Sequence, residues 1–182
     1  MKMMKKMLTA IVFYFTFQST VSAQITTFDT CQYIHQFNGE WLYANGNDTI
    51  RVFLRAQRNT YTGLHSLEDR LFGWHEYKQS NTVIESTYAN RYMTISNVDT
   101  ITKRSFSIWL KMGTDNDCNG IPRTAGGTIR DYLQANETKI VTVKLDATGT
   151  IMTWEQRHSE GFGVFTGATG MTLPKEFILI KQ

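Results

Sequence analysis

The sequence predicts an all-β protein, folded as a single antiparallel up-and-down β-barrel of eight to ten strands. Three observations lead to this fold class. Thr and Asn are abundant and aromatic residues make up 13% of the chain, which is a composition typical of strands. Short segments of alternating apolar and polar residues recur along the chain. Turn-forming residues separate most of these segments by a few positions, which favours neighbours that run up and down.

The first hairpin is marked by an Asn-Gly pair at 45–46, the strongest short-range hairpin signal. It separates a strand at 39–43 from a strand at 48–57. From Ile50 onward the second strand alternates apolar and polar residues, so one face suits a core and the other suits water. The same reasoning predicts further strands at residues 70–78, 82–87, 92–95, 105–112, 128–134, 139–145, 150–156 and 176–181.

Helix is predicted only at residues 27–36, as a short segment outside the barrel and before its first strand. Sequential strands with one apolar face each have two economical arrangements, a closed barrel or a two-sheet β-sandwich. The short connections favour the barrel, because a sandwich usually needs longer crossings between its sheets. Closure also removes exposed sheet edges.

Residues 1–23 have the features of a cleaved signal peptide. Three lysines precede a largely apolar stretch of eleven residues at 7–17, and Val21 and Ala23 fit the small residues that signal peptidase prefers. The apolar stretch is shorter than the roughly 20 residues needed to cross a bilayer, so no membrane insertion is expected. We therefore predict a periplasmic or extracellular protein with one domain at 24–182.

The charge of the mature chain is balanced. The full chain has 19 Lys and Arg against 16 Asp and Glu, and the three lysines of the signal account for its whole formal charge of +3. A neutral protein offers no electrostatic reason to bind nucleic acid or an anionic membrane surface. We exclude nucleic acid as a partner on this ground.

Two cysteines remain after removal of the signal, Cys31 near the start and Cys118 in a polar loop. A pair of this kind in an oxidising compartment more often bridges than stays free, so we predict a disulfide bond. The alternative is two thiols too far apart to meet.

The opening stretch FNGEWLYANGNDTI, with Gly39-x-Trp41 at the head of its first strand, resembles the start of the calycin-type barrels, the lipocalins and avidins. SFSIW at 105–109 and IMTWEQR at 151–157 are similar to the aromatic-bearing later strands of avidins. The resemblance implies a lipocalin-like barrel in which Trp41 packs across one end. It also places the two cysteines roughly where avidins have a disulfide.

Three patterns along the mature chain resemble a second family more closely. They are G-x-W-x-Y-x-N-G at 39–46, the strand residues Leu71, Gly73 and Tyr77, and Leu173-Pro174 followed by FILIK. This family consists of small secreted bacterial proteins of unknown function from flavobacterium-like bacteria. The resemblance implies the fold and the export of the chain, and it brings no activity.

No constellation of residues commits the chain to a reaction. The four histidines lack the i, i+2 or i, i+4 spacing that places two on one metal. Asp115-x-Asp117-x-Asn119-Gly120 matches the first half of a calcium loop, but the twelfth position is Gly126 instead of Glu. The chain has no G-x-S-x-G motif. We therefore predict a protein that is not an enzyme and has no metal or cofactor.

Carboxylates, Glu85 and Asp131 among them, are scattered along the chain, and most of them fall on faces expected to point outward. An enzyme would instead need perturbed groups that converge in a cleft. This expectation is a further reason to predict a binding protein.

The aromatic residues support two hypotheses besides simple filling of the barrel. In a hollow barrel they would form a cup for a small apolar molecule, the function we favour from sequence. The candidate ligand-binding residues are then Trp41, Tyr43, Trp109 and Trp154. In a solid barrel the outer loops would bind a protein or a glycan. These loops are residues 58–69, 113–127 and 159–172. A cavity below roughly 300 Å³ would favour the loops.

Overall fold

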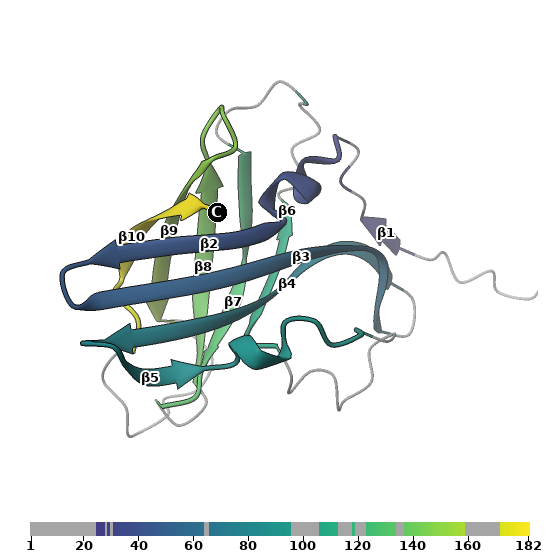
Figure 1. The fold of residues 1–182 in the computed structure, drawn as a ribbon. Helices are drawn as coiled ribbons and strands as arrows, with labels where there is room; N and C mark the ends of the chain where they lie inside the picture. The colour runs from purple at the N-terminus through teal and green to yellow at the C-terminus, as the bar shows by residue number, and fades with distance from the viewer. Residues whose placement is uncertain are drawn as a thin grey trace, which may run out of the picture.

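Eight antiparallel strands close into a barrel in the computed structural model (Figure 1). The model describes residues 25–27, 29, 31–63, 66–95, 106–112, 118, 123–133, 137–158 and 172–182. The barrel strands are β2 (Gly39–Asn45), β3 (Asp48–Gly63), β4 (Ser66–Gln79), β6 (Ile108–Met112), β7 (Arg123–Asp131), β8 (Glu137–Leu145), β9 (Ile151–His158) and β10 (Glu176–Lys181). They pair in this order, and β10 pairs back onto β2, so the predicted barrel is confirmed over the sandwich.

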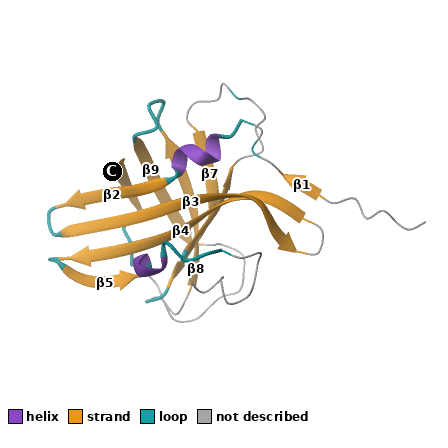
Figure 2. Cartoon of the chain, turned by 45° about the vertical axis from the view of Figure 1, so that its right-hand side comes forward, coloured by secondary structure: helices purple, strands orange, loops and turns teal. Residues whose placement is uncertain are grey.

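Two strands lie outside the barrel wall, and both pair with β4 (Figure 2). The first, β1 (Ile25–Thr27), runs parallel to β4, and the second, β5 (Thr82–Ser86), runs antiparallel to it. The helix predicted at 27–36 is a single 3-10 turn, η1 (Tyr33–Phe37), and a second 3-10 turn is η2 (Tyr88–Asn90). The chain thus follows sequence order around the barrel, except where β5 leaves the wall.

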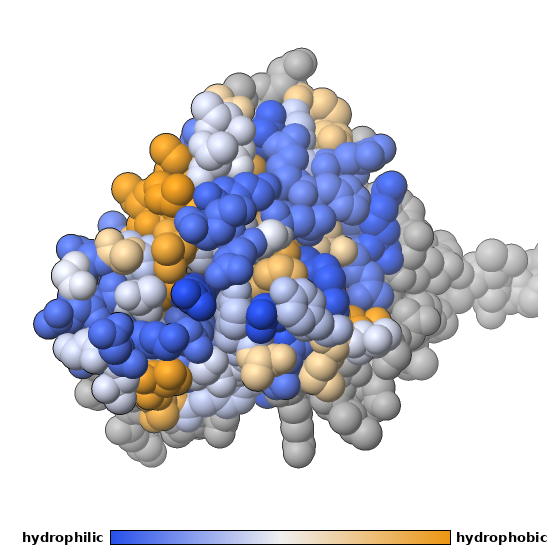
Figure 3. All heavy atoms as spheres, in the orientation of Figure 1, coloured by the Kyte–Doolittle hydropathy of each residue, from blue (hydrophilic) through white to orange (hydrophobic). Residues whose placement is uncertain are grey.

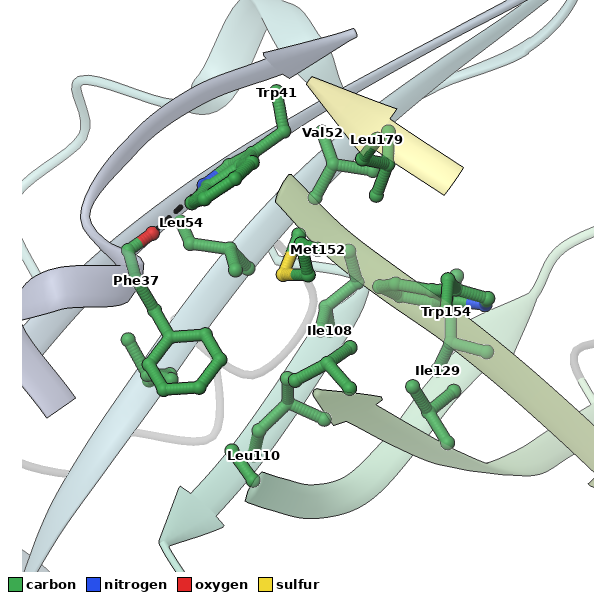
Figure 4. Packing of buried hydrophobic residues seen from close by; sticks show 14 of the residues in the cluster. Phe37, Trp41, Val52, Leu54, Ile108, Leu110, Ile129, Met152, Trp154 and Leu179 are labelled. Carbon is green, nitrogen blue, oxygen red and sulfur yellow. Dashed lines mark hydrogen bonds between the residues drawn. The ribbon is translucent and has the colours of Figure 1, made fainter. Parts of the chain in front are cut away.

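The barrel interior is a continuous apolar core (Figure 4). Strand alternation turns one set of side chains inward, and the largest of these, Trp41 and Trp154, have no exposed surface. The turn η1 closes one end of the barrel, because Ile34 and Phe37 enter the core there. The indole N–H of Trp41 donates to the carbonyl oxygen of Phe37 at 2.8 Å, which fixes the turn against the first strand.

The predicted loop at 58–69 is wrong, since β3 continues to Gly63 and β4 begins at Ser66. Thr60, Tyr61 and Thr62 have the β-branched or aromatic side chains that favour strands. A register shift after Gln57 accommodates the extra length of this hairpin.

The predicted strand at 92–95 is also wrong, because its backbone carbonyl groups bond to side chains and not to a neighbouring strand. The guanidinium of Arg55 donates to the carbonyl oxygens of Met93 at 2.6 Å and of Arg91 at 3.5 Å. The side-chain amide of Gln57 donates to the carbonyl oxygen of Ile95 at 3.4 Å. These bonds fasten the segment across the outer face of β3.

The strand predicted at 128–134 is displaced, because β7 already begins at Arg123 and ends at Asp131. The predicted loop at 113–127 therefore ends earlier than expected. Its two glycines, Gly126 and Gly127, belong to the strand, and Gly127 is needed there. A Cβ at this position would lie 2.8 Å from the Cα of Leu110 on β6 and still closer to the carbonyl oxygen of Trp109.

Cys31 and Cys118 form a disulfide bond, as the sequence predicted, with their Cα atoms 5.2 Å apart. The bridge joins the segment before η1 to the connection between β6 and β7. No helix in the described part of the chain is both long and apolar enough to span a membrane. The predicted signal peptide and nearly all of the predicted loop at 159–172 lie outside the described residues.

Candidate functional site

The four aromatic residues predicted to form a cup do not lie together. Trp41 and Trp154 are fully buried inside the barrel, on the two strands that flank β10, at positions paired with Lys181 and Phe177. Tyr43 is half-buried and contacts Phe177 with ring centroids 5.4 Å apart. Trp109 points the other way, onto the outer face of β6, where it stacks on Phe72 at 6.2 Å. Three of the four therefore belong to the packed interior and one to the outer surface.

The outer face of β3, β4 and β6 carries an aromatic cluster of its own, separate from the barrel core. Its buried members are Phe72, Trp74 and Phe106, and Trp109 packs against them. The guanidinium of Arg55 lies 5.0 Å from the ring centroid of Trp74. A cation over an aromatic face is attracted by the ring quadrupole, so this contact also holds Arg55 against the outer wall.

Five buried polar side chains gather at the end of the barrel opposite to η1. We call them the polar cluster, and they are His75, Glu85, Asp131, Lys139 and Gln156. The strand β7 runs from one end of the barrel to the other. Its first residue, Arg123, bonds to Gln36 of η1, and its last residue, Asp131, belongs to the polar cluster, so the cluster and η1 lie at opposite ends. Ionisable groups that converge at one end of a barrel are the usual mark of a functional site.

The polar cluster surrounds a cavity of about 10 Å³, which Ile129, Arg130 and Leu173 also line. A volume of this size accommodates about one water molecule. Small-molecule sites are usually 300 Å³ or more in order of magnitude, so this cavity is far too small for a ligand of ordinary size.

The carboxylates of the polar cluster point inward, which corrects the outward orientation expected from the sequence. A carboxylate oxygen of Glu85 accepts from the backbone N–H of Tyr132 at 3.0 Å. The carboxylate of Asp131 accepts from the backbone N–H of Thr172 at 2.9 Å and from its hydroxyl at 2.7 Å. Both groups therefore bind backbone segments that close this end of the barrel.

Gln156 acts in the same way. Its side-chain N–H groups donate to the carbonyl oxygens of Leu173 at 2.9 Å and Pro174 at 3.1 Å. Its side-chain oxygen accepts from the indole N–H of Trp154 at 3.3 Å. Leu173 is drawn into the core by these contacts, so the residues before β10 cover the barrel end. Sequence periodicity could place these polar side chains on a face but could not identify their partners.

Ser107, His75 and Glu85 form a chain of contacts that resembles a nucleophile, a base and an acid. The hydroxyl oxygen of Ser107 lies 2.7 Å from His75 Nδ1, and His75 Nε2 lies 3.4 Å from Glu85 Oε1. The second contact has poor hydrogen-bond geometry, so we describe it as a loose polar contact. All three side chains are buried.

The position of Ser107 explains this chain of contacts structurally. Here β4 changes its partner, from β6 at Leu71–Gly73 to β5 at Glu76–Gln79. Around this change the backbone N–H of Ser107 donates to Gly73 at 3.0 Å, and the N–H of Thr87 donates to His75 at 2.8 Å. Side-chain hydroxyls of Ser107 and Thr87 complete the bonding, 3.0 Å apart. Ser107, His75 and Thr87 therefore close the junction where β4 changes from β6 to β5, which we call the seam of the barrel.

Acyl transfer would require more than these contacts. It needs a substrate carbonyl beside the serine and donors for the developing oxyanion. The cavity of the polar cluster is too small to hold such a group, and Ser107 does not line it. Within the described residues, no three His, Cys, Asp or Glu side chains lie close enough to hold a metal ion.

The outer face of β2, β9 and β10 is unexpectedly apolar. Its outward residues form what we call the aliphatic patch, which consists of the exposed Ala44, Ile151, Ile178 and Ile180 and the half-buried Leu42. The side chains of Ile178, Ile180 and Ile151 are 55%, 47% and 41% exposed. Figure 3 shows hydrophobic residues gathered where β9 and β10 lie in Figure 1. The run FILIK was the signal in the sequence, since it has no polar residue at its outward positions.

The chain belongs to a family of unknown function (DUF6705), whose model matches residues 1–182. This agrees with the unknown-function family expected from the sequence. No curated protein and no solved structure matches the chain. The resemblance to calycins and the bacterial group named with it remain predictions from sequence motifs.

Proposed function

We propose that this member of a family of unknown function is an exported binding module that acts through its outer surface and is not an enzyme. One observation carries the proposal. Where the structure describes the barrel interior, side chains fill it, and the cavity at the polar cluster has a volume of only about 10 Å³. A ligand of ordinary size would have to displace Trp41, Trp154 or their neighbours, each of which is fully buried.

Displacement of these side chains would be costly. Removing a large aromatic side chain from a packed core typically costs about 3–5 kcal/mol, which an incoming ligand would have to offset before any net binding. We therefore prefer the outer surface to the apolar cup that the sequence suggested. The cup stays a prediction, which the titration described below tests.

Export is part of the proposal for two reasons. Residues 1–23 read as a cleaved signal peptide. The disulfide between Cys31 and Cys118 fits an oxidising compartment, where such bonds persist. The periplasm and the exterior of a bacterial cell both satisfy these conditions.

A ligand titration tests the filled interior. Tryptophan fluorescence of the purified protein is followed while a panel of fatty acids, biotin and other small apolar molecules is added. We expect no saturable change, because Trp41 and Trp154 have no free space beside them. The double variant Trp74→Phe and Trp109→Phe is the matched control, since it removes the emission of both outer-face tryptophans and leaves Trp41 and Trp154. Saturable binding seen by the interior tryptophans of this variant would overturn the proposal.

A second experiment tests the absence of esterase chemistry at Ser107. The hydrolysis of an activated ester is compared between the protein and its Ser107→Ala variant. We expect the same slow background rate for both, because Ser107 is buried and does not line the cavity of the polar cluster. A rate that falls on substitution of Ser107 would show that the seam is catalytic.

A further inference from the structure

The aliphatic patch has no counterpart in an ordinary barrel wall. Antiparallel strands that face water on one side alternate apolar inward and polar outward residues. In β10 the inward residues Phe177 and Leu179 are buried, but the outward residues Ile178 and Ile180 are isoleucines as well. A sheet surface of this kind, rimmed by polar residues, marks an interaction site.

Strand register gathers the patch into one continuous surface. Ile180 is directly opposite Leu42 on one side and Ile151 on the other. Directly opposite residues have Cβ atoms about 4.5–5.5 Å apart, so these three side chains touch or nearly touch. Ile178 lies two positions along the same face of β10, opposite Thr153. The result is a gently curved apolar face on three adjacent strands.

The shape of the patch restricts what can cover it. It lies on the convex wall of the barrel, and small ligands and amphipathic helices require a concave pocket or groove. A sheet face of this kind packs best against another sheet face, at a separation of about 10 Å. A second copy of the same chain supplies such a face.

Charges at the two ends of the central row complement each other. The row crosses β3, β2, β10 and β9 and ends in the turn after β8, and it reads, in order, Arg51, Leu42, Ile180, Ile151 and Asp146. It therefore has a cation at one end, three aliphatic residues in the middle and an anion at the other end. Arg51 is exposed and contacts Glu40 with a distance of 4.0 Å between nitrogen and oxygen.

The charge at Asp146 is present at any ordinary pH. Hydrogen bonds from the Thr148 hydroxyl and from the backbone N–H groups of Ile151 and Thr150 lower the pKa of its carboxyl group to about 2. The carboxylate thus carries a full negative charge beside the patch.

From this surface we infer that the protein forms a two-fold symmetric dimer in which the aliphatic patches of two copies face each other. The inference rests on the proposed function, since it names the outer face that binds and the partner. A two-fold axis in the interface, parallel to β10, reverses the central row. Arg51 of each copy then faces Asp146 of the other, and the aliphatic residues face one another, so the interface is self-complementary.

The same symmetry creates one unfavourable contact between two like charges. Glu176 is exposed on β10, two positions before Ile178, and therefore lies close to the axis. It approaches its own copy across the interface, and like charges that approach each other oppose association. Substitution of Glu176 should consequently strengthen the dimer, an effect that a nonspecific hydrophobic contact would not produce.

Sedimentation velocity of the purified protein, from about 1 to 100 µM, tests this inference. We expect a concentration-dependent species of twice the chain mass. Ile180→Lys should be monomeric over the whole range. Val83→Lys is the matched control, because Val83 is an exposed aliphatic strand residue, 50% exposed, on β5 away from the patch. Circular dichroism establishes that each variant is folded.

Charge variants provide the second readout. Arg51→Asp should weaken dimerisation about tenfold, since two ion pairs become two repulsive pairs. Added salt should weaken the dimer of the natural chain and strengthen that of Arg51→Asp. Glu176→Gln should tighten association. Three results would overturn the inference. They are a natural chain that is monomeric at every concentration, an Ile180→Lys variant that dimerises with unchanged affinity, and a Val83→Lys variant that loses as much dimer affinity as Ile180→Lys. None of these results depends on the ligand titration, so the proposed function can stand or fail separately.

Discussion

Two adjacent glycines in β7 should respond in opposite ways to the same substitution. In Gly127→Ala the new Cβ would lie 2.8 Å from the Cα of Leu110, where ordinary carbon contacts are about 3.5–4.0 Å. The carbonyl oxygen of Trp109 is closer still, and both obstructions are backbone atoms. Relief therefore requires β6 and β7 to separate by about 1 Å, against the usual spacing of about 4.8 Å between paired strands.

The cost follows from this displacement. Overpacking typically costs about 1–3 kcal/mol, and a backbone obstruction lies at the upper end because no side chain can rotate away. Ala for Gly also reduces the entropy of the unfolded chain, which offsets about 0.4–1 kcal/mol. We expect Gly127→Ala to lower the free energy of unfolding by about 2 kcal/mol or more. In Gly126→Ala the nearest atom is 3.8 Å away, so the entropy effect alone remains and stability rises by up to about 1 kcal/mol.

Equilibrium unfolding in urea compares the two variants. With a slope of about 2 kcal/mol per molar urea, a difference of about 3 kcal/mol separates their midpoints by about 1.5 M. The slopes should be equal, because both variants unfold the same barrel. Equal midpoints, or a Gly127→Ala protein more stable than Gly126→Ala, would refute the close approach of β6 and β7 and with it the register of this part of the barrel.

Three further predictions concern the bridge, the seam and the turn before β9. Removing the disulfide by the double substitution Cys31→Ser and Cys118→Ser should lower the free energy of unfolding in urea by about 4–5 kcal/mol, because the bridge joins residues 87 positions apart. An unreduced natural protein that is no more stable than the double variant would contradict this. Ser107→Ala should cost about 1–3 kcal/mol by leaving His75 Nδ1 buried without its partner; an unchanged midpoint would remove the structural role of the seam. The folded pKa of Asp146 is lowered from 3.8 to about 2, so its contribution is present above pH 4 and is lost as pH falls toward 2. Asp146→Asn should therefore lower the melting temperature at pH 7 and not at pH 2, and an equal loss at both would exclude the carboxylate charge as the cause.

The first hairpin was predictable because its signals are local. The two turn residues are Gly46 and Asn47, one position beyond the predicted pair at 45–46, and the alternation that begins at Ile50 determines which face of β3 enters the core. The same is true of β10, whose residues were predicted without error. The disulfide was predictable from the compartment and the number of cysteines.

Features that depend on distant partners were not predictable. The glycines at 126–127 look like a loop in the sequence, and only the proximity of β6 shows that the strand requires Gly127. Segment 92–95 has the pattern of a strand, but Arg55 takes the carbonyl groups that pairing would use. Alternation alone could not show this competition.

The candidate site was predicted least well for the same reason. Glu85 and Asp131 are charged residues that local patterning assigns to water. Their burial becomes acceptable only because Tyr132 and Thr172, which lie 47 and 41 positions away, bring backbone donors to them. The outward aliphatic residues of β10 were visible in the sequence, but a run of apolar residues could equally have been a strand buried on both faces.

The most direct test of the filled barrel is collisional quenching of tryptophan fluorescence by acrylamide. Trp41, Trp74 and Trp154 have no exposed surface, whereas Trp109 is partly exposed on the outer wall. Quenching in the natural protein should therefore come from Trp109, and the Trp109→Phe variant should be almost unquenched while still folded. Strong quenching in that variant would mean that acrylamide reaches the interior tryptophans, and a barrel with such access would contradict the proposal that the protein acts only through its outer surface.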